Sequence, residues 1–119
     1  MSYDITLNDP ITGDTILFDT PHQLKGGNYA LNGTDEAWLN ITYNYVEHFK
    51  RTIDKDKGIR AIYGKTEAES IPILKNAITQ LKDDVSDDYW EPTEGNAKRA
   101  ILNLLAFAQM RPDGIWDGD

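Results

Sequence analysis

The fold is decided by residues 93–119, which read TEGNAKRAILNLLAFAQMRPDGIWDGD. The apolar residues in the first part of this stretch recur at the spacing of one face of a helix. Thr93 is a residue typical of the position just before a helix. The pattern predicts a helix over about residues 93–110. Its buried stripe is expected to contain Ala97, Ile101, Leu104, Leu105 and Ala108.

The residues that follow this helix predict an ordered C-terminal segment. Pro112 cannot continue a helix, and Asp113-Gly114 is a turn signal. The chain is therefore expected to reverse, so that Trp116 packs back on the domain. A disordered tail is poor in aromatic residues, which supports the same prediction.

Gly95 is unusual in the first turn of a helix, where it costs about 1 kcal/mol relative to Ala. It has two interpretations. The free N–H groups of a helix start, left open by a glycine, can bind an anion. Alternatively, another backbone segment packs on Gly95, and of the two we favour this packing.

Two further helices are predicted upstream. Val46, Phe49 and Ile53 recur at helical spacing, so a helix is expected over residues 45–53 with Asn44 as its cap. Thr66 and Glu69 match a capping box. Because a proline deep in a helix loses a hydrogen bond, we expect the main helix to open near residue 70, with Pro72 in its first turn. Its core face is expected to consist of Ile71, Leu74, Ile78 and Leu81.

The N-terminal part of the chain predicts strands. Apolar and polar residues alternate over residues 3–7, and residues 15–18 are rich in β-formers. Residues 8–14 between them form a dense turn signal, so a hairpin is expected. Residues 26–28 break the chain, and residues 37–43 predict one more strand. The expected fold is a single α+β domain over residues 1–119. It has a small antiparallel sheet, made of the N-terminal hairpin plus one strand, followed by about three helices packed on one face.

Composition excludes several classes of function. The chain has 119 residues, no cysteine and a net charge of −8. This charge argues against nucleic acid and against anionic membranes, but it permits a cationic protein partner. Cysteine nucleophiles, disulfides and thiolate metal sites are excluded. With no leader sequence and no apolar run of membrane-spanning length, a cytoplasmic protein is expected.

Basic residues gather in one segment of this acidic chain, residues 50–65, which we call the basic segment. It contains two acids, Asp54 and Asp56. Its bases are Lys50, Arg51, Lys55, Lys57, Arg60 and Lys65. Cations near a glycine-bearing turn can hold a phosphate. The alternative is that these charges only solvate a helix end and its loop.

Aromatic residues at the ends of the predicted elements form a second candidate cluster. Its members are Trp38, Tyr43, Tyr45, Tyr63, Tyr89, Trp90 and Trp116. Tyr and Trp suit binding sites because each has a flat apolar face and a hydrogen-bond donor. The alternative is that they cover a small core. We expect Trp38 in the core and Tyr89 or Trp90 partly exposed. The candidate ligand-binding residues are Arg60, Tyr63, Tyr89, Trp90, Thr93 and Asn96.

No catalytic or metal-binding residue is predicted. Asp54 and Asp56 match only part of a calcium loop. Residues 83–88 are better explained as a solvated loop. Asp113, Asp117 and Asp119 lie around glycines and could ligate magnesium, but this grouping is too weak a pattern to predict a metal site. Two histidines leave little for a zinc site, and no nucleophile lies beside a base. We therefore expect a binding protein without a cofactor more than an enzyme.

Several strings within residues 38–119 resemble a family of small phage and prophage proteins whose function is unassigned. They are ITYN (41–44), GIR (58–60), YG (63–64), IPIL (71–74), DYWEPTEGNA (88–97) and PDGIWDGD (112–119). The resemblance implies a phage setting and carries over no site residue. In that setting we expect an accessory protein that acts against host defence. It would bind and sequester a nucleotide-derived small molecule as a homo-oligomer in the bacterial cytoplasm. The alternatives are an acidic inhibitor that occupies a basic groove of a host protein, and a small enzyme or assembly accessory.

Overall fold

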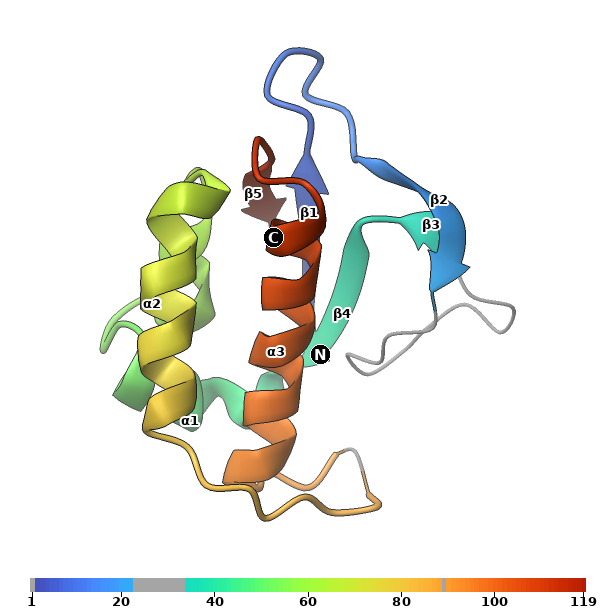
Figure 1. Cartoon of the computed structure of the whole chain (residues 1–119). Helices are drawn as coiled ribbons and strands as arrows, with labels where there is room; N and C mark the ends of the chain where they lie inside the picture. The colour runs from blue at the N-terminus through green and yellow to red at the C-terminus, as the bar shows by residue number, and fades with distance from the viewer. Residues whose placement is uncertain (1, 23–33, 89) are drawn as a thin grey trace.

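The computed structural model describes residues 2–22, 34–88 and 90–119. Its class is α+β, as the sequence predicts (Figure 1). The strands are β1 (Ser2–Asn8), β2 (Leu17–His22), β3 (Thr34–Glu36), β4 (Trp38–Thr42) and β5 (Ile115–Gly118). The helices are α1 (Val46–Thr52), α2 (Glu67–Thr79) and α3 (Glu94–Met110), with 3-10 turns η1 (Tyr43–Tyr45) and η2 (Gly58–Ile62).

The main sheet is antiparallel, with β1 between β4 and β5. The alternating residues Tyr3, Ile5 and Leu7 of β1 are buried, and they form one core with the apolar faces of the helices. In Figure 1, α2 and α3 lie side by side in front of this sheet. The predicted strand at residues 37–43 is confirmed as β4.

The N-terminal hairpin differs from the prediction in its pairing. The turn is present, because Asn8 bridges Thr15 and the Asp9 carboxylate accepts hydrogen bonds from the N–H groups of Ile11 and Thr12. However, β2 pairs with β3 in a separate two-stranded sheet, which projects away from the helices in Figure 1. The physical reason is that β4 and β5 occupy both edges of β1. The predicted break at residues 26–28 lies outside the described residues.

The last helix is confirmed. It spans Glu94–Met110, and the Thr93 side chain caps it by accepting a hydrogen bond from the Asn96 N–H at 3.0 Å. All five residues of the predicted stripe are buried. The local periodicity was therefore sufficient to place this helix and its core face.

Both upstream helices are present, and α1 lies within one residue of its predicted bounds, but the predicted start of α2 and the predicted cap of α1 are wrong. Thr66, not a residue near 70, caps α2, and Thr66 and Glu69 complete the capping box. The bridge between Thr66 and Ile115 and the bond from Glu67 N–H to the Gly114 carbonyl secure this first turn. Pro72 therefore lies inside the helix, at the cost of one hydrogen bond. At the earlier helix, Thr42 caps η1 by accepting from the Asn44 N–H, so Asn44 is not the cap.

The C-terminal segment folds back, as predicted, and pairs with β1 as strand β5. Trp116 is 1% exposed, and its Nε1 donates a hydrogen bond to Ser70 Oγ at 2.7 Å. The sequence did not predict the strand itself. Trp38, expected in the core, is only partly buried, and its Nε1 donates to Asp4 Oδ1 at 3.2 Å.

Candidate functional site

The candidate binding residues lie in two groups. Arg60 belongs to η2, and Tyr63 is the first residue after this 3-10 turn. Trp90, Thr93 and Asn96 lie around the start of α3. Tyr89 lies outside the described residues. The sequence grouped these residues as one site, and the structure separates them into two with different roles.

Arg60 is the centre of the first group. Its guanidinium carbon lies 4.9 Å from the ring centroid of Tyr3 and 5.5 Å from that of Tyr43. Its Nε donates to the backbone oxygen of Asp119 at 2.8 Å, and Nη2 donates to the Tyr43 hydroxyl at 3.0 Å. A guanidinium has five N–H donors, so three remain without a partner among the described residues. The side chain is exposed, and within the same described part of the chain it forms no ion pair with a side-chain carboxylate.

Tyr63 adds a buried hydroxyl to this group. Its Oη is shielded from solvent and has no hydrogen-bond partner in the described part of the chain. Burial raises the pKa of Tyr63 above the ordinary phenol value; the charge of Asp119 raises this pKa further, and Arg60 lowers it. The ring packs on Gly118, where an added Cβ would lie 2.6 Å from the Tyr63 hydroxyl. A buried, unpaired hydroxyl costs about 1–3 kcal/mol, so its presence beside a cation calls for an explanation.

Asn96 in the second group holds the chain's own backbone. Its Nδ2 donates to the carbonyls of Asp88 and Glu91 at 3.1 and 3.0 Å, and its Oδ1 accepts from the Ser86 N–H at 3.1 Å. The residue is 3% exposed. Because these bonds use both amide donors and the acceptor, Asn96 shapes the loop of residues 82–92. The same applies to the Thr93 hydroxyl, which caps α3. Both residues therefore have a structural role in this fold, and their contact with a ligand stays a prediction.

The start of α3 is occupied by the same loop. An added Cβ at Gly95 would lie 2.7–2.9 Å from backbone atoms of Asp83, Asp84 and Val85. The packing interpretation of Gly95 is therefore confirmed. The Gly95 N–H donates to the Asp84 carboxylate at 3.2 Å, so the anion at this helix start belongs to the protein itself.

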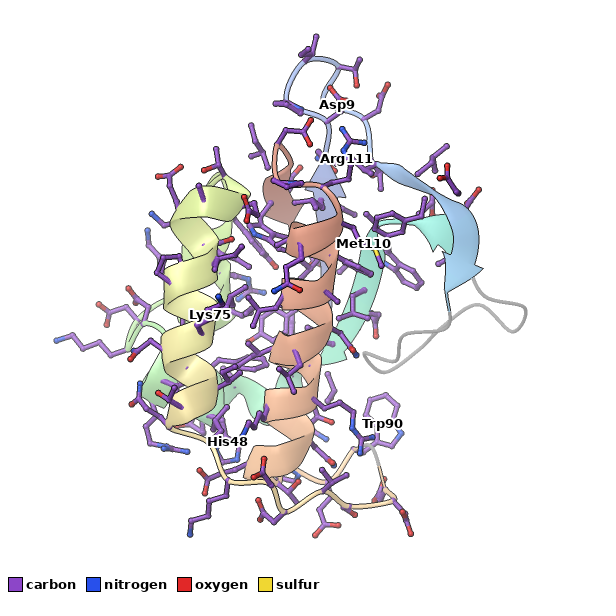
Figure 2. The ribbon with its side chains drawn as sticks, viewed as in Figure 1. Asp9, His48, Lys75, Trp90, Met110 and Arg111 are labelled. Carbon is purple, nitrogen blue, oxygen red and sulfur yellow. The ribbon has the colours of Figure 1, made fainter. Side chains whose placement is uncertain are left out.

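We call residues 82–92 the acidic loop, because several of its carboxylates are exposed. Trp90 lies in it and is 46% exposed, which confirms the expectation that Tyr89 or Trp90 is partly exposed. Figure 2 shows Trp90 beside the start of α3. Its backbone oxygen accepts a hydrogen bond from Asn44 Nδ2 at 2.8 Å.

Helix α1 also holds the acidic loop. His48 Nε2 lies 2.8 Å from the Pro92 carbonyl, and Arg51 Nη2 lies 3.1 Å from His48 Nδ1. Arginine can only donate, so Nδ1 accepts and Nε2 carries the proton that is donated to Pro92. Arg51 also pairs with Glu94 at 3.2 Å. These contacts give His48 a structural role.

The two groups meet at η1. Tyr43 accepts a hydrogen bond from Arg60, and the next residue, Asn44, donates one to Trp90. The sequence analysis placed Tyr43 in the aromatic cluster but not among the binding residues, and it gave Tyr3 no role beyond a strand. The alternation of apolar and polar residues along β1 is the sequence signal that could have assigned Tyr3 to the buried face of the strand, where its ring lies against the Arg60 guanidinium.

In the described ranges, no three His, Asp or Glu residues gather to hold a metal ion. The Asp54 carboxylate instead accepts hydrogen bonds from the N–H groups of Asp56 and Lys57. These bonds lower the pKa of Asp54. Asp113 pairs with Arg111 at 2.9 Å. Among the described residues, no helix is long and apolar enough to cross a membrane.

Comparison of the chain with protein-family models, with curated proteins and with solved structures gives no significant match.

Proposed function

We propose that the chain is a non-catalytic binding protein that takes up an anionic, ring-bearing small molecule at Arg60. The observation that supports this proposal is the exposed guanidinium over the rings of Tyr3 and Tyr43, with no side-chain carboxylate as ion-pair partner in the described part of an acidic protein. In the phage setting suggested by the sequence resemblance, such a protein would sequester a nucleotide-derived defence signal.

The chemistry of the site suits a phosphate with an attached ring. A guanidinium grips phosphate through two parallel hydrogen bonds, and Arg60 has three unpaired N–H groups in this part of the chain. The bonds to Asp119 and Tyr43 hold the guanidinium in place before any ligand arrives. Of the two rings beside Arg60, Tyr3 is buried, while Tyr43 is partly exposed and offers the aromatic surface for a ligand ring.

Titration calorimetry with ADP-ribose and with cyclic nucleotides tests the proposal. Arg60→Ala removes charge-assisted hydrogen bonds worth about 1.5–3 kcal/mol, so we expect affinity to fall by about 10- to 150-fold. Arg60→Lys keeps the charge but loses the planar fork, and it should also bind weakly. Lys57→Ala is the matched control, because it removes one exposed positive charge from the same segment.

Loss of affinity in Arg60→Ala with little change in Lys57→Ala supports the proposal. Equal losses in the two variants would point to diffuse charge attraction instead. Each variant is first checked by its melting temperature, because Arg60 also links Tyr43 to Asp119.

The acidic loop favours a second candidate function, inhibition of a host protein by occupation of a basic groove. Exposed carboxylates lie near Trp90 in the sequence, on a loop that Asn96 binds through Ser86, Asp88 and Glu91. A preformed loop with an aromatic anchor suits protein recognition. Under this function, Asp87→Lys and Trp90→Ala abolish capture of the host protein, while Arg60→Ala leaves it intact.

A further inference from the structure

We infer that the Arg60 site is completed by a second copy of this chain, whose Trp90 lies against it. This inference rests on the proposed function, because it names the source of the ring that covers the ligand. Within the described part of one chain, the rings against the Arg60 guanidinium are those of Tyr3 and Tyr43. Trp90 belongs to the acidic loop on the other side of η1.

The first argument is charge. Four exposed cations of the basic segment form no ion pair with the described residues; they are Lys50, Lys55, Lys57 and Arg60. Asp56 is the exposed acid among them. Four exposed carboxylates of the acidic loop likewise form no ion pair within the described ranges; they are Asp84, Asp87, Asp88 and Glu91. Lys82 is the exposed base among them. The two surfaces thus carry similar and opposite charge.

The second argument is position. The bond from Asn44 to Trp90, the contact of His48 with Pro92 and the ion pair of Arg51 with Glu94 place the acidic loop beside α1. Helix α1 in turn lies against η2, as the contact of Lys50 with Gly58 shows. Figure 2 places both His48 and Trp90 at the end of the molecule where α3 begins. A basic surface and an acidic surface are therefore neighbours on one chain.

Neighbouring surfaces of opposite charge are self-complementary under a two-fold axis. In a symmetric dimer, if a surface of one copy contacts a second surface of its partner, the reverse contact forms as well. Pairing the basic segment of each copy with the acidic loop of the other satisfies both surfaces at once. It also brings each Trp90 towards the Arg60 of the other copy.

Trp90 suits the role of anchor in such an interface. It is nearly half exposed, while its backbone is fixed by the bond to Asn44. Buried tryptophans and arginines carry much of the energy in protein interfaces. A Trp face over a guanidinium or over a ligand ring is also favourable.

Sedimentation equilibrium at low and high salt tests the pairing. Interfaces held by exposed charges weaken as salt screens them, so we expect a dimer at low salt that dissociates at high salt. The double variant Asp87→Lys/Asp88→Lys should be monomeric, as should Lys55→Glu/Lys57→Glu. Mixing these two variants should restore a dimer, because each now carries the charge that the other requires. A wild-type chain that is monomeric at low salt would overturn the inference, and so would dimers that persist in both charge-reversed double variants.

Mixing binding variants tests the contribution of Trp90. Neither Arg60→Ala nor Trp90→Ala should bind ADP-ribose alone. A mixed dimer has one site in which an intact Arg60 faces an intact Trp90 of the other copy. Because random mixing makes about half of the dimers mixed, it should restore roughly one ligand for every two dimers. If Trp90 instead completed the Arg60 site of its own chain, neither site of a mixed dimer would be intact, and mixing would not restore ADP-ribose binding.

The two proposals fail in different ways. A monomer that binds ADP-ribose through Arg60 overturns the inference of a shared site and leaves the proposed function intact. A charge-dependent dimer that binds no probe supports the pairing and overturns the proposed function.

Discussion

The Asp84 carboxylate accepts a hydrogen bond from the backbone N–H of Gly95 at 3.2 Å, in the first turn of α3. A helix start attracts anions, because its first N–H groups lack partners within the helix. Here the acidic loop supplies the anion and packs its backbone on the glycine. The relationship explains why a glycine stands where it weakens the helix. It also leaves Arg60 as the better candidate for an external anion.

Gly95→Ala should destabilise the protein, although the same change in an exposed helix gains about 1 kcal/mol. The added Cβ would lie within 2.9 Å of three backbone atoms of the acidic loop, which cannot move as easily as a side chain. Thermal melting gives the sign of the change. Asp84→Asn, which keeps an oxygen acceptor, is the milder comparison. An Ala variant that melts higher than wild type would show that the loop does not pack on Gly95.

Leu104→Ala should lower the free energy of unfolding by about 2–5 kcal/mol, because it leaves a cavity in the core. Leu104 is 0% exposed, while Leu102 on the same helix is 45% exposed. Leu102→Ala is therefore the control, with an expected change within about 0.5 kcal/mol. Urea unfolding measures both. Similar losses in the two variants would mean that α3 buries a different face.

Ser70→Ala should cost about 1–3 kcal/mol, because it leaves the buried indole N–H of Trp116 unpaired. The change should also shift the fluorescence of Trp116, which senses its hydrogen bond. Thr79→Ala near the end of the same helix is the control, since the Thr79 hydroxyl is exposed. A Ser70→Ala variant as stable as the control would contradict the buried bond.

Tyr63→Phe should leave stability at neutral pH unchanged or slightly higher, because it removes a buried hydroxyl without a partner in the described ranges. Tyr43→Phe, by contrast, loses the bond from Arg60 and should be less stable. A clear loss in Tyr63→Phe would show that this hydroxyl is paired after all.

Alkaline pH provides a separate test of the same residue. Burial raises the pKa of Tyr63, so the folded state disfavours its phenolate. Protonated Tyr63 thus favours the folded state over the unfolded state. Its contribution to the free energy of unfolding is fully present below the ordinary phenol pKa of about 10 and is lost as pH rises through the pKa of the folded state. Wild-type stability should therefore fall more steeply above about pH 10 than that of Tyr63→Phe. Parallel curves for the two proteins would contradict the buried phenol.

Local sequence patterns predicted part of this structure, but they did not predict which strands pair across long sequence distances. The apolar periodicity of residues 97–108 placed α3 and its buried face. By contrast, β5 pairs with β1 more than a hundred residues away, and nothing in its four residues indicates a strand partner. The divergence of β2 from β1 has the same origin, because it depends on which strands already occupy the edges of β1.

The candidate site shows the same limit for polar residues. Arg60 stood out by composition, as a cation in an acidic chain. Asn96 also looked like a binding residue, because a polar side chain at a helix start serves a ligand or a loop equally well. In the structure, Asn96 forms three hydrogen bonds with residues 86, 88 and 91 of the loop. These bonds depend on the tertiary fold, so the sequence pattern alone did not show them.

The most direct test of ligand binding at Arg60 is native mass spectrometry of protein purified from phage-infected, defence-active bacterial cells. Wild type should retain a small anionic molecule that absorbs ultraviolet light and is released on denaturation. Arg60→Ala, purified in parallel, should lack it, while Lys57→Ala should retain it. Wild-type protein that carries no small molecule, but retains a basic host protein whether or not Arg60 is present, would contradict ligand binding at Arg60.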